Sequence, residues 1–194
     1  GWGFVKKKLS KILIIVAVLV FCLHGVKKVA NKFGIHLLEK SNIEINYEHE
    51  WDNISKKDKK IIKKAISLAK KKEKLEYVWG GKGEIMTEER LDELIGYYGE
   101  KQYPLDKKDY IGKQAFDCSG LVYWVYEEAS GVNIGYSTSQ QQENLEKYKV
   151  KGDLQPGDLI FTTRHVVMYI GDGKIVQSKN KFKYPEGGIH EQPI

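Results

Sequence analysis

A cysteine at the start of an apolar helix is the feature that most constrains how this chain folds. Residues 116–120 read Phe-Asp-Cys-Ser-Gly, and the run LVYWVYEEAS follows and ends at Gly131. Apolar residues recur there at helical spacing, and a glycine just after the last of them is typical of a left-handed C-cap. The predicted buried face comprises Leu121, Val122, Trp124, Val125 and Ala129. The pattern therefore predicts a helix that carries Cys118 in its first turn and buries one broad face.

Cys118 is predicted to be a free, reactive thiol. The second cysteine, Cys22, is 96 positions away inside an apolar run, so no disulfide is expected. A lone cysteine is more often a buried, inert residue, but the neighbours Asp117 and Ser119 disfavour that interpretation. At a helix start the dipole and the unpaired N–H groups lower a thiol pKa, and a nearby protonated histidine lowers it further. We therefore expect the pKa of Cys118 to lie below its usual value.

The last third of the chain carries a β-hairpin signal around a histidine. A turn at Leu154-Gln-Pro-Gly-Asp158 leads into an expected strand over 159–163, His165 heads a second strand over 166–170, and Gly171-Asp-Gly173 turns the chain into a third over 174–178. This order predicts two antiparallel strands joined by a tight turn, with His165 at the start of the first of them.

The register of that hairpin decides whether Gln177 reaches His165. A three-residue loop over 171–173 places Gln177 opposite Val167, on the same face as His165, whereas a two-residue loop places it opposite Met168, on the other face. A catalytic role requires the three-residue register, in which Gln177 orients the imidazole and His165 shares a proton with Cys118. Taken alone, His165 is equally an ordinary histidine at a strand edge.

Four motifs together resemble one enzyme family over about residues 58–194. They are YVWGG at 77–81, FDCSG at 116–120, LQPGDLIF from residue 154, and HVVMYIGDGKIVQ from His165 to Gln177. In combination they are similar to the NlpC-type cell-wall peptidases, which are papain-like cysteine enzymes of bacteria. The resemblance implies an α+β domain in which the cysteine-bearing helix packs on an antiparallel sheet that carries the histidine. It also implies hydrolysis of peptidoglycan stem peptides, typically between D-γ-glutamyl and the diamino acid.

The resemblance assigns catalytic roles to four residues. Cys118 corresponds to the nucleophile, His165 to the general base and Gln177 to a third residue that is often His or Asn in relatives. A glutamine accepts an N–H from imidazole but adds no charge to stabilise imidazolium. Tyr77 corresponds to a hydroxyl beside the cysteine that supports the oxyanion together with the backbone N–H of Cys118.

Three further residues are expected to bind substrate. Asp117 and Ser119 resemble the pair that recognises the substrate's amino terminus in relatives that cut free-ended stem peptides, although plain helix capping is the alternative role. Trp79, in the YVWGG turn, is placed with them as a substrate-binding residue.

An insertion of 34 residues over 82–115 departs from the family, whose members join these two motifs by a short loop. Within it, TEERLDELIGYY at 87–98 predicts a short acidic helix capped at Thr87, with Leu91, Leu94 and Ile95 on one face. The insertion either walls the substrate cleft or forms a partner surface, and the sequence leaves both open.

The front of the chain has a membrane-directed pattern. Residues 12–23 are twelve consecutive apolar residues between lysine clusters, whereas a spanning helix needs about 20. Extension over residues 9–29 adds length, and the flanking lysines snorkel to the interfaces. We predict an uncleaved anchor within residues 1–30 that contacts the membrane through 12–26. A buried core element and a cleaved signal are the alternatives, but small residues suited to cleavage are missing, and Phe21 before Cys22 disfavours lipidation.

Behind this anchor we expect a juxtamembrane helix and linker over 31–54, and then the catalytic domain over 55–194. Residues 55–74 predict an amphipathic helix capped at Ser55, with a lysine face that attracts anionic lipid or wall polymers. The first 74 residues hold 18 lysines against 7 acidic residues, and the remainder holds 14 basic residues against 19 acidic ones. Because the basic helix has neither arginine nor interleaved aromatic residues, no nucleic-acid partner is expected. Scattered histidines without CxxC or HExxH spacing predict no metal and no cofactor.

These observations predict a single-pass bacterial membrane protein whose catalytic domain lies on the extracytoplasmic side and cuts peptidoglycan stem peptides. Cell-wall remodelling or conjugative transfer is the expected context, with a membrane complex as partner. Two alternatives stay open. One is a CHAP-type amidase or peptidase, which shares the order of cysteine before histidine, and the other is a catalytically silent wall-binding scaffold.

Overall fold

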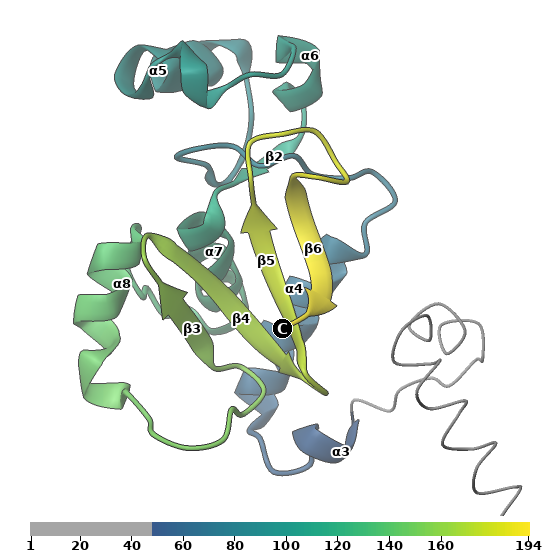
Figure 1. The fold of residues 1–194 in the computed structure, drawn as a ribbon, viewed down its shortest axis with the longest axis vertical. Coiled ribbons are helices and arrows are strands. Elements are labelled where there is room, and N and C mark those ends of the chain that lie inside the picture. The colour runs from purple at the N-terminus through teal and green to yellow at the C-terminus, as the bar shows by residue number, and fades with distance from the viewer. Residues whose placement is uncertain (1–47) are drawn as a thin grey trace, which may run out of the picture. The chain divides into compact units, whose positions relative to one another are not determined.

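The computed structural model describes residues 48–194, which form an α+β domain (Figure 1). Its main sheet has four antiparallel strands in the order β3-β4-β5-β6, so neighbours in sequence are neighbours in space. Their bounds are β3 Leu159–Thr162, β4 His165–Gly171, β5 Lys174–Lys179 and β6 Gly188–Pro193. The predicted fold class and the predicted strands around His165 are therefore confirmed.

Two helices pack on one face of this sheet and enclose the core (Figure 1). Helix α4 spans Lys56–Ala69 and begins at Ser55, whose hydroxyl accepts a hydrogen bond from the backbone N–H of Asp58, as the capping signal predicts. Helix α7 spans Cys118–Ser130. The fully buried core residues between these helices and the sheet include Ile62, Phe116, Val125, Val166, Ile170 and Val176. Burial of this apolar surface is what holds α7 against the strands.

The cysteine helix has the predicted ends. Asp117 caps its N-terminus by accepting a hydrogen bond from the backbone N–H of Gly120, and Gly131 ends it in the left-handed conformation at a φ of 64°. Cys118 is the first helical residue. Of the predicted apolar face, Leu121, Val122 and Val125 are buried, and Trp124 and Ala129 are partly buried against the core. The local sequence thus determines both where this helix begins and which side it buries.

The insertion is an ordered subdomain with its own apolar cluster. It contains β1 Lys82–Ile85, α5 Glu88–Tyr98, the 3-10 helix η1 Glu100–Gln102, α6 Lys107–Tyr110 and β2 Gln114–Phe116. Thr87 caps α5 as predicted, and β1 pairs antiparallel with β2. The cluster consists of Val78, Met86, Leu91, Leu94, Tyr103, Tyr110 and Ala115, so the insertion packs on the segment that precedes it.

The folded domain begins before residue 55. Helix α3 spans Glu48–Trp51, and the buried Trp51 indole donates a hydrogen bond of 2.9 Å to the carbonyl of Ile170 in β4. Trp51 and the partly buried Ile54, which lie in the segment predicted to be the linker, therefore pack in or against the core. The described domain is completed by α8 Thr138–Leu145 and the 3-10 helix η2 Glu146–Tyr148.

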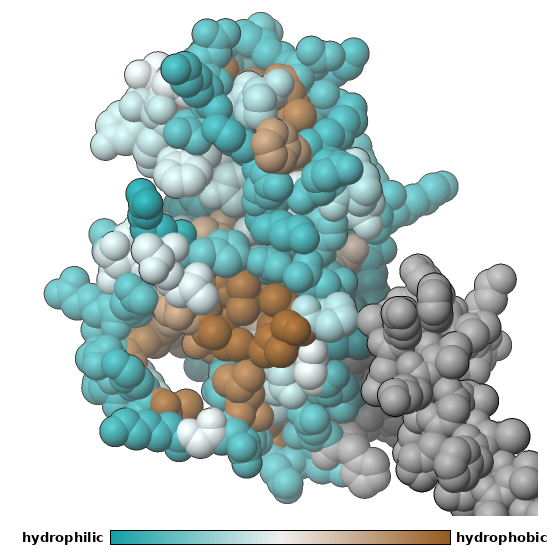
Figure 2. Space-filling view, in the orientation of Figure 1, coloured by the Kyte–Doolittle hydropathy of each residue, from teal (hydrophilic) through white to brown (hydrophobic). Residues whose placement is uncertain are grey.

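The opposite face of the sheet carries a smaller apolar cluster of Val167, Tyr169 and Ile175 (Figure 2). Within residues 48–194 no helix has the length and apolarity that a membrane crossing requires. The predicted anchor within 1–30 and the juxtamembrane segment up to residue 47 lie outside the described residues.

Candidate active site

The hairpin loop is the shorter of the two that the sequence allows. Gly171 pairs with Lys174, so the loop contains only Asp172 and Gly173. The three-residue loop over 171–173, with which the catalytic interpretation was linked, is therefore not formed. Asp172 and Gly173 both have positive φ, at 51° and 66°, which is the geometry of a tight two-residue hairpin turn.

A β-bulge restores the register that the catalytic interpretation needs. Ile170 is the extra residue in β4, because the register shifts between Tyr169 and Gly171. Beyond the bulge Met168 pairs with Val176, so the next residue of β5, Gln177, comes level with Val167. The short loop and the bulge compensate each other.

His165 and Gln177 are in direct contact across the two strands. The Oε1 atom of Gln177 lies 2.7 Å from Nε2 of His165, and the Gln177 side chain is buried. Because a carbonyl oxygen only accepts hydrogen bonds, this contact assigns the imidazole proton to Nε2. The Nδ1 atom is then left with a free lone pair and is the basic nitrogen of the site.

The Cys118 thiol lies against the start of β4, on which His165 sits. Its sulfur is 4.0 Å from the carbonyl oxygen of Arg164, and the backbone N–H groups of Val166 and Ser119 lie within hydrogen-bonding reach of it. The residues on both sides of His165 therefore touch the cysteine. Helix α7 thus places the predicted nucleophile against the two chain neighbours of the predicted base, although 46 positions separate Cys118 from Arg164.

Burial raises the pKa of the Cys118 thiol above its ordinary value, and the carboxylate of Asp117 raises it further. The backbone N–H groups of Val166 and Ser119 and the ammonium of Lys82 act in the opposite direction but do not prevail. The expectation of a lowered pKa is therefore wrong, because the side chain is only 7% exposed and desolvation outweighs the helix terminus. In this environment the thiol needs a base to take its proton.

Tyr77 is buried next to the cysteine. Burial is the main cause that raises the pKa of its hydroxyl far above the usual value, followed by the charges of Asp117 and Cys118. The hydroxyl consequently keeps its proton across the physiological pH range and stays a hydrogen-bond donor. A donor in this place suits the oxyanion role that the sequence predicts.

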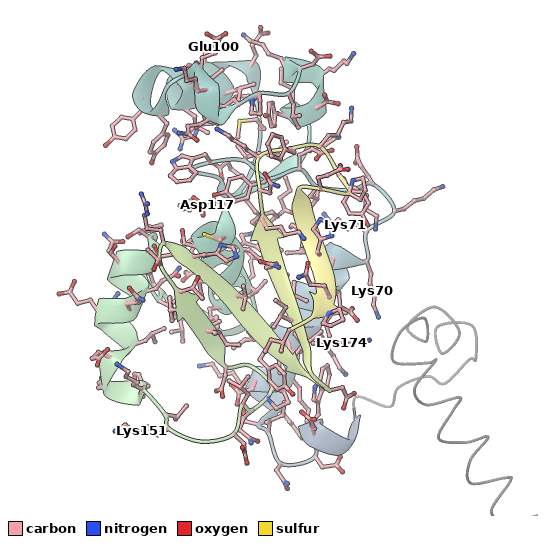
Figure 3. All side chains as sticks on the ribbon, in the orientation of Figure 1. Lys70, Lys71, Glu100, Asp117, Lys151 and Lys174 are labelled. Carbon is pink, nitrogen blue, oxygen red and sulfur yellow. The ribbon has the colours of Figure 1, made fainter. Side chains whose placement is uncertain are left out.

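Asp117 lies at the N-terminus of α7 (Figure 3) and forms one buried polar cluster with Ser119. The Ser119 hydroxyl lies 2.8 Å from Oδ1 of Asp117 and 3.1 Å from the carbonyl oxygen of Tyr136. The Asp117 carboxylate also accepts hydrogen bonds from the backbone N–H of Gly120 at 2.6 Å and of Gly80 at 3.0 Å. Helix capping is thus an actual role of Asp117, and the same carboxylate ties the WGG turn to the helix.

The sequence did not predict the third member of this cluster, Lys82. Its ammonium lies 2.6 Å from Oδ2 of Asp117 and 3.1 Å from the hydroxyl of Ser119. The available signal was its place directly after the YVWGG motif, but nothing local indicated which way the side chain points. Lys82 is also the first residue of the insertion and of β1.

Trp79 lies between the active site and the insertion. Trp79 is 40% exposed, and its ring makes tilted or edge contacts with Tyr77 at 6.4 Å and with Tyr98 of α5 at 6.3 Å between ring centroids. The hydroxyl of Tyr103 donates a hydrogen bond to the Trp79 carbonyl oxygen. The insertion therefore supports the WGG turn and adds aromatic side chains beside it.

Among residues 48–194 no group of three or more histidine, cysteine or acidic side chains has the geometry to hold a metal ion.

Residues 74–186, more than half of the chain, match the NlpC/P60 family. The gamma-DL-glutamyl hydrolase of Bacillus subtilis is 36% identical over 90 residues, which are 44% of this chain and 21% of that protein. The murein DD-endopeptidase MepH of Escherichia coli is 32% identical over 74 residues, which are 34% of this chain and 27% of that protein. The matched regions thus span about a quarter of the length of these relatives. The P60 domain of antigen MAP1204 from M. avium subspecies paratuberculosis aligns with 71% of this chain and 85% of its own, at 22% identity and a TM-score of 0.45.

Proposed function

Because the chain belongs to the NlpC/P60 family, we propose that it is a peptidoglycan hydrolase in which Cys118 attacks a stem-peptide amide. The observation that carries the proposal is the contact between His165 and Gln177, which leaves a basic nitrogen on the strand that touches the cysteine sulfur. Names of relatives support the substrate class, since one is a murein endopeptidase and another a γ-glutamyl hydrolase.

The proposed reaction begins with transfer of the Cys118 proton to Nδ1 of His165. Gln177 holds the imidazole through Nε2 in the orientation that this transfer needs. The thiolate adds to the amide carbonyl carbon, and the resulting oxyanion receives hydrogen bonds from the Tyr77 hydroxyl and the backbone N–H of Cys118.

The second half of the reaction returns the enzyme to its starting state. Imidazolium gives its proton to the leaving amine as the carbon–nitrogen bond breaks, and a thioester to Cys118 remains. Water then attacks the thioester with His165 as base, which releases the carboxylic acid and restores the thiol. Because the pKa of Cys118 is raised in the resting site, the ion pair forms only when His165 is present to accept the proton.

We further propose that the bond cut lies between D-γ-glutamyl and the diamino acid. The name of the Bacillus subtilis relative supports this choice, whereas the name of MepH indicates D,D-cross-links as the competing one. Mass spectrometry of muropeptides released from purified walls distinguishes the two bonds through the new peptide ends.

The decisive control is Cys118→Ala. We expect new peptide ends in walls treated with the wild type and none in walls treated with this variant. If walls of several chemistries yield no product and iodoacetamide fails to alkylate Cys118 even at a pH above the ordinary thiol range, the catalytic proposal is wrong and a wall-binding scaffold replaces it.

We also propose that residues 12–26 anchor the protein in the bacterial membrane, with the catalytic domain on the extracytoplasmic side. The support is the apolar run between lysine clusters, and the side follows from where peptidoglycan lies. We expect the anchored enzyme to act with a membrane complex in wall remodelling or conjugative transfer.

Two experiments test these proposals. Protease added to intact protoplasts should remove the catalytic domain from an anchored protein, and copurification after cross-linking should identify the complex. Protection of the domain in intact protoplasts would contradict the proposed side.

A further inference from the structure

The Lys82 ammonium occupies the polar cluster beside the nucleophile. It forms an ion pair of 2.6 Å with Asp117, and the two side chains are only 24% and 12% exposed. Charge-assisted hydrogen bonds of this length are strong, and removal of one partner would leave the other charge largely buried without compensation. Lys82 is thus a fixed part of the site.

With Lys82 in place, the Asp117 carboxylate has no vacant acceptor position. Its Oδ1 accepts from the backbone N–H of Gly120 and faces the hydroxyl of Ser119, whose one proton is shared between Asp117 and the carbonyl oxygen of Tyr136. Its Oδ2 accepts from the backbone N–H of Gly80 and from Lys82. A carboxylate offers about four lone-pair positions. A substrate amino group would therefore have to displace one of these groups to reach the carboxylate.

The backbone holds Lys82 in this position. It pairs with Phe116 in the β1–β2 ladder, and its N–H donates a hydrogen bond of 2.6 Å to the carboxylate of Glu84. The preceding residue, Gly81, lies so close to the backbone of Ala115 and Phe116 that a Cβ would be within 2.7 Å of it. Because the chain is fixed on both sides, the ammonium is directed into the cluster by the fold of the insertion.

This ion pair lies next to the reacting sulfur. Asp117 precedes Cys118 in the chain, and the charges of both Asp117 and Lys82 reach the thiol. A group that binds at the cluster is therefore part of the same substrate that presents its amide to Cys118.

We propose that Lys82 is a specificity-determining residue that takes the place of a substrate amino group. On this basis the enzyme acts on stem peptides whose amino end is blocked, as it is while the peptide is still attached to the glycan strand. The inference rests on the proposed function and defines its substrate class.

Two physical effects produce this selectivity. A free substrate ammonium meets the like charge of Lys82 in a poorly hydrated site, which is unfavourable. An acylated amino end brings a carbonyl oxygen instead, and an ammonium has three N–H donors, of which Asp117 and Ser119 use two. The third N–H is directed to that oxygen.

The test uses two peptides that differ only at the amino end, L-Ala-γ-D-Glu-diaminopimelate with a free amine and the same peptide N-acetylated. The kcat/KM ratio of acetylated to free peptide is measured for the full-length wild type, Lys82→Met and Lys82→Arg. Lys107→Met serves as matched control, since Lys107 belongs to the insertion and makes an ion pair of 2.7 Å with Asp92 away from the cluster.

We expect the wild type to prefer the acetylated peptide. Lys82→Met exposes the carboxylate to the substrate amine, so the ratio should shift toward the free peptide by about ten- to hundredfold, the range of a hydrogen bond to a charged group. Lys82→Arg and Lys107→Met should keep the wild-type ratio.

Preference of the wild type for the free peptide, or an unchanged ratio in folded Lys82→Met, overturns the inference while leaving the hydrolase proposal intact. If the wild type cleaves neither peptide nor wall, the proposed function fails separately. In that case calorimetry measures how tightly Cys118→Ala binds each of the two peptides. The inference about Lys82 requires that the acetylated peptide binds more tightly. If Lys82→Met does not fold, the kcat/KM ratios of the wild type and of Lys82→Arg test the inference, because both should favour the acetylated peptide.

Discussion

The Oε1 atom of Gln177 lies 2.7 Å from Nε2 of His165, although the loop that joins their strands is too short for the simplest pairing that would bring them together. The bulge at Ile170 supplies the missing residue, so that both side chains share one face of the sheet. The pairing of the proposed base with its positioning residue therefore depends on an irregularity in β4.

Replacement of Gln177 should reveal how much orientation of the imidazole contributes. Gln177→Ala removes the acceptor, and kcat is expected to fall by about ten- to hundredfold with little change in KM, the cost of one hydrogen bond to a group that becomes charged. Gln177→Glu adds a charge that stabilises imidazolium, so the acid limb of the pH–rate profile should move to higher pH. A Gln177→Ala variant with wild-type kcat would show that Gln177 does not position His165.

The raised pKa of Cys118 predicts how its reactivity depends on pH. Because burial and the Asp117 carboxylate favour the thiol, alkylation by iodoacetamide should be slow at pH 7.5 and accelerate as the pH increases above the ordinary thiol range. Asp117→Asn removes the negative charge and keeps a side chain that caps helices well, so the alkylation profile should shift to lower pH.

Peptide-resolved mass spectrometry separates alkylation of Cys118 from alkylation of Cys22. An unchanged or upward-shifted profile in Asp117→Asn would contradict the electrostatic explanation for the raised pKa.

The contact between the WGG turn and the cysteine helix should tolerate no extra atom. A Cβ at Gly120 would lie 1.9 Å from the carbonyl oxygen of Gly81, so Gly120→Ala must displace backbone and should destabilise the domain by about 1–3 kcal/mol or more. Gly96 is the matched control, since it is exposed in α5 and has no neighbour within 4 Å of a Cβ. Gly96→Ala should add about 0.5–1 kcal/mol. Chemical denaturation measures both, and equal effects of the two substitutions would refute the close approach.

Trp51 tests whether the segment before residue 55 belongs to the domain. Trp51→Ala leaves a cavity at a position that is only 7% exposed, and a loss of about 3–5 kcal/mol in unfolding free energy is expected. Trp51→Phe keeps most of the volume but removes the hydrogen bond to Ile170, which should cost about 1 kcal/mol. Stabilities within error of the wild type for both variants would mean that α3 is dispensable to the fold.

Trp79 should contribute to substrate binding more than to stability, because it is 40% exposed beside the site. Trp79→Ala is expected to raise KM about tenfold, with a small change in kcat and melting temperature, as loss of an aromatic contact would. Tyr148→Ala, at an exposed aromatic residue of η2, provides the control and should leave KM unchanged. A fall in kcat at constant KM would argue that Trp79 acts on the chemistry.

Features encoded by neighbouring residues were predictable from the sequence. The caps at Ser55, Thr87 and Asp117 and the C-cap at Gly131 are found where the local pattern places them. Cys118 at a helix start and His165 at a strand start follow from such short-range signals, since both depend on residues within one or two turns or strand lengths.

Local sequence patterns predicted helices α4, α5 and α7, strands β3, β4 and β5 and the three residues proposed for catalysis, and the family resemblance implied the α+β class. The register, burial and charged neighbours of these residues depend on the tertiary structure. The bulge at Ile170, the burial that raises the pKa of Cys118 and the insertion of Lys82 between Asp117 and Ser119 all arise from contacts between segments far apart in the chain. Capping and periodicity act over a few residues, whereas desolvation and ion pairing depend on which distant groups the packed core brings together.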